Sequence, residues 1–224
     1  MKKEHIHNSS LHKHDCHHES LKEEIISHIP FAILSVALSI IALSLLTYRT
    51  LEVDAAKKLF HVFHYLHLLF SGTGVVLIFR KYSNNVPMAL LSGFLVPAIF
   101  CTLSDSIMPF IGGLYLGLDM HFHWCFIHHL GSVLPFLTFG VLNGFVIGRH
   151  AEGKSLFYSA GSHFFHIFIS AMASILYFYG FGFDQWYNQI GFIFVYLIIA
   201  VLVPCSLADI VVPISFAKFK MKRR

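Results

Sequence analysis

Charged side chains are scarce in this sequence. They make up 12% of its 224 residues, whereas a soluble domain carries about 25%, so most of the protein surface must face something other than water. The first 28 residues are too polar to form a secretory signal peptide. We therefore expect the first apolar segment to remain in the protein as an uncleaved membrane anchor.

Cysteine is rare, and nucleotide-binding motifs are missing. The four cysteines are scattered and form no CxxC pair, which excludes a disulfide framework. The chain has no Walker motif and no glycine-rich phosphate loop, so we expect that it does not use ATP directly. The HExxH signature of zinc proteases is absent as well.

Long apolar runs, in contrast, are abundant. Hydrophobic residues make up 56% of the chain, and a helix needs about 20 mostly apolar residues to cross the hydrocarbon core of a membrane. Six stretches meet this requirement, at about residues 29–48, 58–80, 86–112, 125–148, 156–180 and 188–214. Because the alternating pattern of barrel strands is absent, we predict an all-α polytopic membrane protein with six transmembrane helices.

The distribution of Lys and Arg predicts how the chain is oriented. With six spans both termini lie on the same side, and all but three of the 16 Lys and Arg residues fall on that side, the exceptions being Arg49, Lys57 and Lys58. Positive residues favour the cytoplasm, so we predict a multi-pass protein of the inner (cytoplasmic) membrane with both termini cytoplasmic. The net charge of +4 then reflects membrane topology, and we expect no nucleic-acid partner.

Two motifs occur twice, in the same order and on matching predicted helices. HxxHxxxS spans residues 64–71 and 163–170, and C-[TS]-L-x-D-x-x-x-P spans residues 101–109 and 205–213. Duplication explains this agreement, and three spans per half make the second half enter the membrane from the opposite face, as in inverted-repeat transporters. The predicted divisions are a cytoplasmic, disordered His-rich tail (1–27), two inverted three-helix repeats (28–118 and 119–216) and a basic cytoplasmic C-terminus (217–224). A weaker match pairs His28 with His129.

Two aspartates fall deep within predicted spans. Asp105 and Asp209 occupy the same place in the two motif copies, and an acidic residue inside a membrane usually marks a functional site. Each copy also has a proline upstream, Pro97 or Pro204, and another inside the motif. We therefore predict that the third and sixth helices are kinked or unwound near the aspartates.

The histidine pairs point to a metal. Histidines three residues apart share one face of a helix, and two imidazoles with a carboxylate suit zinc, iron, cobalt, nickel or manganese. The predicted metal ligands are His64, His67, Asp105, His163, His166 and Asp209. Further candidate ligands are His61, Cys101, Cys205, Asp119, His121, His123, His128 and His129. The motif serines, Ser71 and Ser170, have two roles open to them, hydrogen bonds to the ligands or to helix carbonyls, and we favour the second.

Two regions outside the predicted spans strengthen the metal hypothesis. The N-terminal tail offers a second set of ligands, of the kind that His-rich tracts use to bind metal. These residues are His5, His7, His12, His14, Cys16, His17 and His18. The stretch from Asp119 to His129, at the predicted external end of the third and fourth helices, is placed to capture or release an ion.

The sequence thus predicts a proton-coupled secondary transporter of a divalent transition-metal ion, with zinc preferred. Its expected partners are the metal, protons and the lipid bilayer, and a homodimer stays open. The site lies between helices 2, 3, 5 and 6, as one shared site or two neighbouring sites. The alternatives are an intramembrane metal-dependent enzyme, either a zinc hydrolase or a di-iron oxidoreductase, and a haem-b electron-transfer protein. The direction of transport is undecided.

Overall fold

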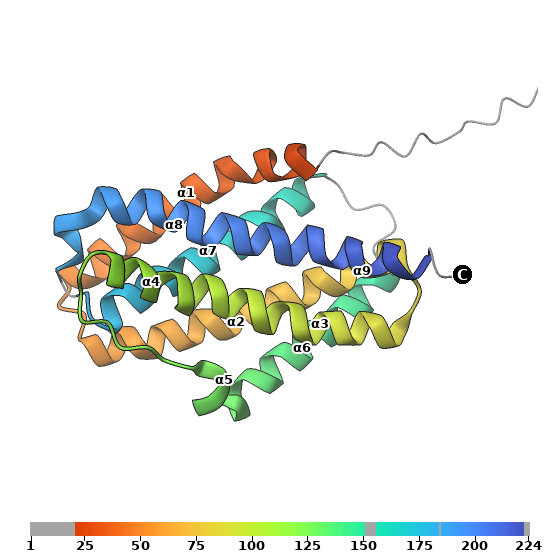
Figure 1. Cartoon of the computed structure of the whole chain (residues 1–224), viewed down its shortest axis with the longest axis horizontal. Helices are drawn as coiled ribbons and strands as arrows, with labels where there is room; N and C mark the ends of the chain where they lie inside the picture. Colours follow the sequence, from red (N-terminus) through yellow and green to blue (C-terminus); the bar gives the residue numbers. More distant parts are fainter. Residues whose placement is uncertain (1–20, 151–155, 184, 222–224) are drawn as a thin grey trace, which may run out of the picture.

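The computed structural model describes residues 21–150, 156–183 and 185–221, and every secondary-structure element within these residues is helical (Figure 1). Six helical spans are long and apolar enough to cross a membrane, as predicted: His28–Tyr48, Val53–Tyr82, Val86–Tyr115, Leu130–Gly148, His163–Gly180 and Trp186–Ala217. The ligands predicted in the N-terminal tail, His5, His7, His12, His14, Cys16, His17 and His18, lie outside the described residues.

Three of the spans are simple helices and three are composite or preceded by short turns. The elements are α1 (Leu21–Tyr48), α2 (Val53–Tyr82), α3 (Val86–Thr102), η1 (Leu103–Ile107), α4 (Met108–Tyr115), α5 (Cys125–His128), α6 (Leu130–His150), α7 (Leu156–Gly180), η2 (Trp186–Gln189), α8 (Ile190–Ser206), η3 (Leu207–Val211) and α9 (Val212–Met221). The third span is α3, η1 and α4 in succession, and the sixth is η2, α8, η3 and α9.

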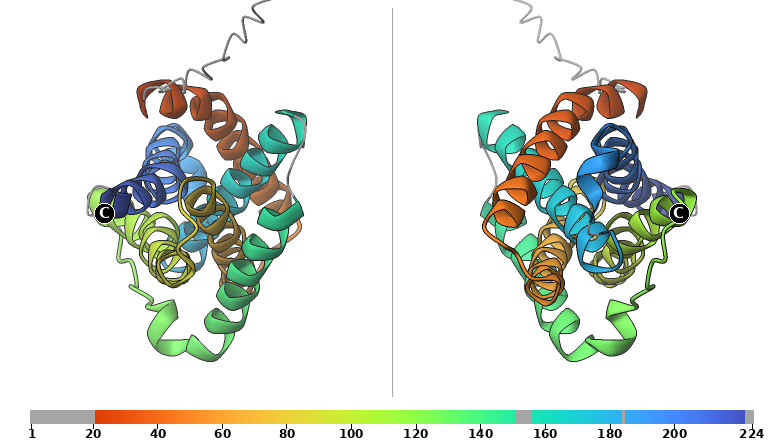
Figure 2. Two further views of the ribbon diagram at one scale, coloured as in Figure 1. Left: turned by 90° about the vertical axis from the view of Figure 1, so that its right-hand side faces the viewer. Right: turned by 90° about the vertical axis from the view of Figure 1, so that its left-hand side faces the viewer.

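Successive spans run in opposite directions and form an elongated bundle (Figure 1). We call one end the loop end, because it contains residues 49–52, 116–118, 181–183 and 185–189; from there the chain runs along the side of the bundle to α5 (Figure 1). The other end holds the 83–85 loop and both ends of the described chain. Seen end-on, α2 lies in the middle, with α1 and α6 on the outside (Figure 2). The most buried spans are α7 and, after it, α2, so these two helices position the interior of the bundle.

The helices of the two halves are interleaved. Helix α1 packs against α7 and α8, whereas α6 packs against α2 and, less extensively, α3. Small residues allow the closest of these approaches: a Cβ on Gly140 would overlap the backbone of Leu69, and one on Gly144 would lie 2.7 Å from the Val76 side chain. Each half therefore packs its first helix mainly against the other half.

The two aspartate motifs adopt a π-helical turn. Asp105 lies in η1 and Asp209 in η3, and the first residue after each turn bonds back across five residues, as Met108 N–H does to the Leu103 carbonyl. Pro109 and Pro213 stand four residues after the aspartates and lack the N–H that an α-helix would use there. The helices are thus locally rewound and remain continuous, so of the two predicted distortions, a kink or an unwound segment, the structure excludes the unwound segment.

The fourth span begins later than predicted. The sequence placed its start near residue 125, but residues 125–128 form a separate turn and α6 starts at Leu130. The break is at His129, whose backbone (φ −130°, ψ 30°) is not helical. Hydropathy averaged over a long window missed this break, because apolar residues lie on both sides of His128 and His129.

Candidate metal centre

A buried network of polar side chains lies where α2, α7 and the two π-helical turns meet. From α2, the Nδ1 atoms of His64 and His67 lie 2.9 and 2.8 Å from Oδ2 of Asp105. All three side chains are fully or almost fully buried. A carboxylate can only accept here, so both imidazoles donate to it through Nδ1. The structure thus brings together the three ligands predicted from the first half.

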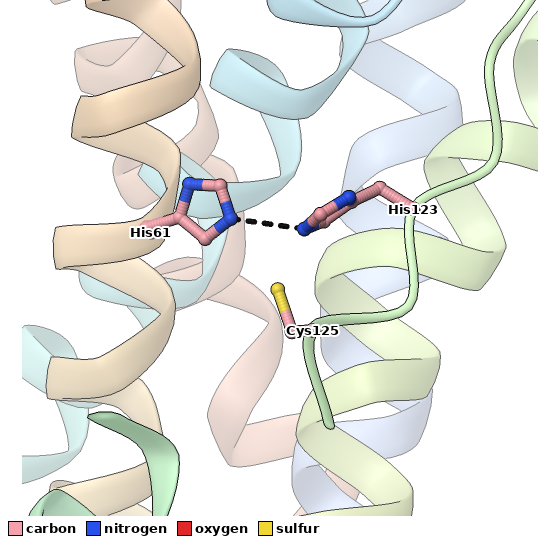
Figure 3. A group of neighbouring side chains, drawn as sticks. All are labelled: His61, His123 and Cys125. Carbon is pink, nitrogen blue, oxygen red and sulfur yellow. Dashed lines mark hydrogen bonds between the residues drawn. The ribbon is translucent and has the colours of Figure 1, made fainter. Parts of the chain in front are cut away.

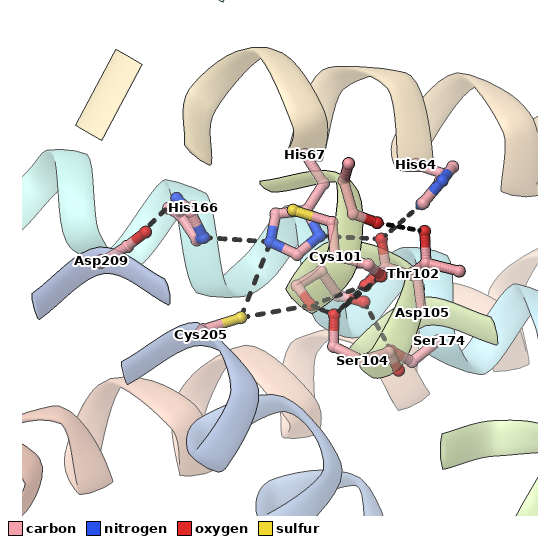
Figure 4. A network of polar contacts seen from close by, with 12 residues as sticks. His64, His67, Cys101, Thr102, Ser104, Asp105, His166, Ser174, Cys205 and Asp209 are labelled. Carbon is pink, nitrogen blue, oxygen red and sulfur yellow. Dashed lines mark hydrogen bonds and ion pairs between the residues drawn. The ribbon is translucent and has the colours of Figure 1, made fainter. Parts of the chain in front are cut away.

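The second half contributes the continuation of the same network. His166 on α7 places its Nε2 3.0 Å from Nε2 of His67, and its Nδ1 lies 3.5 Å from Oδ2 of Asp209. Asp209, His166, His67 and Asp105 therefore follow one another in a row (Figure 4). In each half an aspartate faces the Nδ1 atom of a histidine, and the two Nε2 atoms face each other.

A thiol completes a group of three donors between the halves. Cys205 Sγ lies 3.6 Å from Nε2 of His67, and the donor atoms of His67, His166 and Cys205 all lie within 4.8 Å of one another. Zinc with bonds of about 2.0–2.1 Å to nitrogen and about 2.3 Å to sulfur in tetrahedral geometry sets two nitrogens about 3.4 Å apart and nitrogen and sulfur about 3.6 Å apart. The three buried donors can hold a metal ion after a small opening of the two imidazoles.

Serines fix the aspartates unequally. Ser170 on α7 donates to Oδ1 of Asp105 at 2.9 Å, and Ser104 donates to the same oxygen at 2.6 Å. Ser170 thus orients a carboxylate, which differs from the carbonyl partner expected from the sequence. Its counterpart Ser71 lies beside Asp209 without a hydrogen bond of ordinary geometry, and Oδ1 of Asp209 has no partner in the described part of the chain. The Asp105 carboxylate is therefore held by several hydrogen bonds, whereas the Asp209 carboxylate has fewer and longer contacts.

His163, also a predicted ligand, lies outside the group of three donors. Its Nδ1 lies 3.3 Å from Nε2 of His28 on α1, with the rings edge to face. His163 stands one turn from His166 on α7. It therefore extends the row of imidazoles from the central group toward the end of the bundle where the described chain begins.

A second group of three donors lies near the loop end. Nε2 of His61 lies 3.0 Å from Nε2 of His123, and the Cys125 thiol points toward the two rings (Figure 3). Of the other predicted ligands in this region, Asp119, His121 and His128 are exposed. The half-buried His129 lies against His61, with ring centroids 4.5 Å apart.

The loop-end donors that lie outside the spans have shifted pKa values. Burial, with the neighbouring imidazoles of His61 and His129, lowers the pKa of His123 to about 4. Burial raises the pKa of the Cys125 thiol to about 12. At physiological pH the His123 ring is therefore neutral, whereas the thiol must lose a proton to a metal.

Sequence reasoning and the structure differ most on the cysteines. Cys101 and Cys205 occupy equivalent motif positions; Cys205 belongs to the central group, while Cys101 lies beside His67 (Figure 4). Cys125 lies within the stretch that the sequence predicts to capture or release an ion, but it was not singled out there as a ligand. Its signal was present in the sequence, since it follows His123 by two residues in a His-rich stretch.

Comparison with known proteins adds no relative to this picture. No model of a known protein family matches the chain, and neither curated proteins nor solved structures give a match. What the protein does must therefore be argued from the chemistry of its two donor groups and from the arrangement of its helices.

Proposed function

We propose that this protein is a secondary transporter of a divalent transition-metal ion such as zinc, coupled to protons. The observation that carries the proposal is the central group: His67, His166 and Cys205 converge from both halves of the chain within a bundle of apolar spans. The geometry of a metal site that both halves share depends on the relative position of the halves, whereas a site formed by one half alone does not depend on it. Alternating access in a transporter needs this dependence.

An inverted repeat is part of this proposal. The packing of α1 on α7 is the counterpart of the packing of α6 on α2 if a pseudo-twofold axis relates residues 28–118 to residues 119–216. The two π-helical turns and the two carboxylate–imidazole contacts also correspond under that axis. With the axis in the membrane plane, the central group lies close to it, where inverted-repeat transporters bind substrate.

The unequal bonding of the two halves supports alternating access. Asp105 is held by two imidazoles and two serines, whereas Asp209 has one longer contact and an unpartnered oxygen. If the halves exchange these two states, rocking of one repeat against the other tightens one side while it loosens the other. The ion at the central group then faces each side of the membrane in turn.

Proton coupling follows from the donors. Both Nε2 atoms must offer lone pairs to a metal and the Cys205 thiol must ionise, so binding releases protons. The row from Asp105 through His67 and His166 to Asp209 places acceptors for those protons beside the site. A thiolate beside two imidazoles favours zinc or cobalt over manganese, which prefers oxygen ligands.

The orientation is proposed from charge. Among the residues that the structure describes, Arg49, Lys57 and Lys58 are the only Lys or Arg residues near the loop end, and the other described ones lie toward the opposite end of the bundle. The loop end would then face away from the cytoplasm and both termini toward it, in a cytoplasmic membrane.

Reconstitution into lipid vesicles tests the proposal. We expect zinc to enter proteoliposomes that contain the protein, faster when an imposed pH gradient lets protons move the other way, and we expect Asp105→Ala and Asp209→Ala to abolish this flux. Asp54→Ala is the matched control, since Asp54 is an exposed aspartate on α2 paired with Lys57. Undiminished flux in the two variants would overturn the assignment of the site.

A metal-dependent intramembrane enzyme is the second candidate. Two imidazoles and a thiolate leave a fourth zinc position open, as catalytic zinc sites do. Tightly bound zinc that does not exchange, together with a lack of flux, would favour it. A haem held between His67 and His166 is disfavoured, because nitrogens 3.0 Å apart leave no space for the macrocycle.

A further inference from the structure

The loop-end group is formed by two separate parts of the chain. His61 belongs to α2, and His123 and Cys125 belong to the segment between α4 and α6. Their donor atoms lie within 4.8 Å of one another, and the two imidazoles are half-buried while the thiol is buried. The group therefore has its thiol in the protein interior and its imidazoles open to the solvent side.

The surrounding contacts hold these donors in a ligating arrangement. Nδ1 of His61 lies 2.6 Å from the Lys57 carbonyl, which can only accept, so Nδ1 carries the proton and the Nε2 lone pair points to Nε2 of His123, from which it accepts a hydrogen bond that a metal ion would replace. Metal-bound histidines are commonly oriented through their second nitrogen in this way.

The segment that carries His123 is fixed to α7. The His123 N–H donates to the hydroxyl of Tyr177 at 3.1 Å, the same hydroxyl donates to the His121 carbonyl, and the His121 N–H donates to the Phe181 carbonyl. These three hydrogen bonds set the position of the extended backbone on which His123 stands.

A third histidine on α2 lies between the two groups. His61, His64 and His67 follow at three-residue intervals, so the outer two are about 9 Å apart along the helix axis. His64 is fully buried, and its Nε2 atom has no hydrogen-bond partner within the described residues. A buried donor or acceptor without a partner is costly, and a passing cation would supply one.

We propose that His61, His123 and Cys125 form a second metal site for a zinc-like divalent ion, and that this site exchanges its ion with the central group past His64. The exchange rests on the proposed transport function, whereas metal binding at the loop end does not. The site has the same donor set as the central group, two imidazoles and one thiol, so an ion keeps similar ligands at both positions.

Cobalt binding to the full chain in detergent tests the second site. Cobalt bound by a thiolate shows a sulfur-to-metal absorption band, and each proposed site has one cysteine. We expect Cys125→Ser and His123→Ala each to remove one thiolate-bound cobalt per chain and to leave the one that depends on Cys205. Cys16→Ser measures the contribution of the N-terminal tail, and Asn188→Ala, at an exposed polar residue of η2 near the same end of the bundle, is the control that changes nothing.

Two outcomes would overturn the proposal. Unchanged cobalt stoichiometry in both variants would mean that the loop-end group binds no metal, and loss of all thiolate-bound cobalt in both would mean that the two groups are not separate sites. In proteoliposomes we expect Cys125→Ser to raise about tenfold the zinc concentration at the loop-end face that gives half-maximal flux. If the wild-type protein shows no flux but the cobalt result holds, transport fails and the second site stands.

Discussion

At the scale of single residues, the two intramembrane aspartates orient ligands and need not be ligands themselves. Each faces the Nδ1 atom of a histidine whose Nε2 atom lies in the central group. A carboxylate in that position fixes the ring and raises its basicity as a ligand. We therefore interpret Asp105 and Asp209 as positioning residues for His67 and His166.

Amide substitution separates this role from direct ligation. Asp105→Asn keeps the shape of the side chain but weakens its hold on His67, and we expect zinc affinity to fall by about 10–100-fold, as for other outer carboxylates of metal sites. Asp209→Asn should cost less, because its contact with His166 is 3.5 Å where that of Asp105 with His67 is 2.8 Å. Competitive zinc titration of the purified variants measures both, and equal losses would contradict the difference in role.

The sequence predicted most of the central residues but not their roles. His67, His166 and the aspartates were identified because two motif copies carry them at matching positions. The same symmetry made Cys101 and Cys205 equivalent, so the sequence could not indicate that only Cys205 joins this group of three. That distinction arises from the packing of α8 and η3 against the rest of the bundle, which a motif does not encode.

At the scale of elements, the π-helical turns present the aspartates to the site. A π-turn changes the direction of side chains relative to the α-helix around it, and such turns are frequent at functional sites. In η1 the missing N–H of Pro109 leaves the Asp105 carbonyl without the usual partner four residues on.

Restoring that N–H should return η1 toward α-helix and turn Asp105 away from His67. We expect Pro109→Ala to lower zinc affinity about tenfold, as for loss of an outer-shell partner, without lowering the midpoint of thermal unfolding. Pro135→Ala is the matched control, since Pro135 is an exposed proline inside α6. Wild-type zinc affinity in Pro109→Ala would show that the π-turn does not position Asp105.

The contact between α2 and α6 depends on glycine. A methyl group on Gly140 would overlap the Leu69 backbone, whereas one on Gly131 meets nothing within 4 Å. Because overpacking costs about 1–3 kcal/mol, we expect Gly140→Ala to lower the free energy of unfolding by that amount and Gly131→Ala to leave it unchanged or raise it. Unfolding in mixed detergent measures both, and equal stability of the two variants would contradict the close approach.

Element boundaries were the weaker part of the sequence prediction. Hydropathy located all six spans, because each is apolar over at least 18 residues. It extended the fourth span back to residue 125, since Cys125, Phe126 and Ile127 are apolar and only His128 and His129 separate them from the rest of the span. The break at His129 lies beside the loop-end group, and the His129 ring contacts the rings of His61 and His123.

At the scale of the whole molecule, the two donor groups and the His28–His163 pair follow α2 and α7 through the bundle. His61, His64 and His67 lie along α2, and the row of imidazoles continues on α7 with His166 and then His163. This path between the two ends could not be predicted from either helix alone, because it depends on the crossing of α2 and α7 at the central group.

The central claim is that one transported ion is bound by both halves of the chain. Zinc uptake by proteoliposomes containing His67→Ala, His166→Ala or both substitutions tests it most directly. If both imidazoles bind the same ion, each single variant should fall to the low uptake of the double variant, with no further loss on combination. Independent partial losses that add in the double variant, or wild-type uptake no greater than that of protein-free vesicles, would contradict the account.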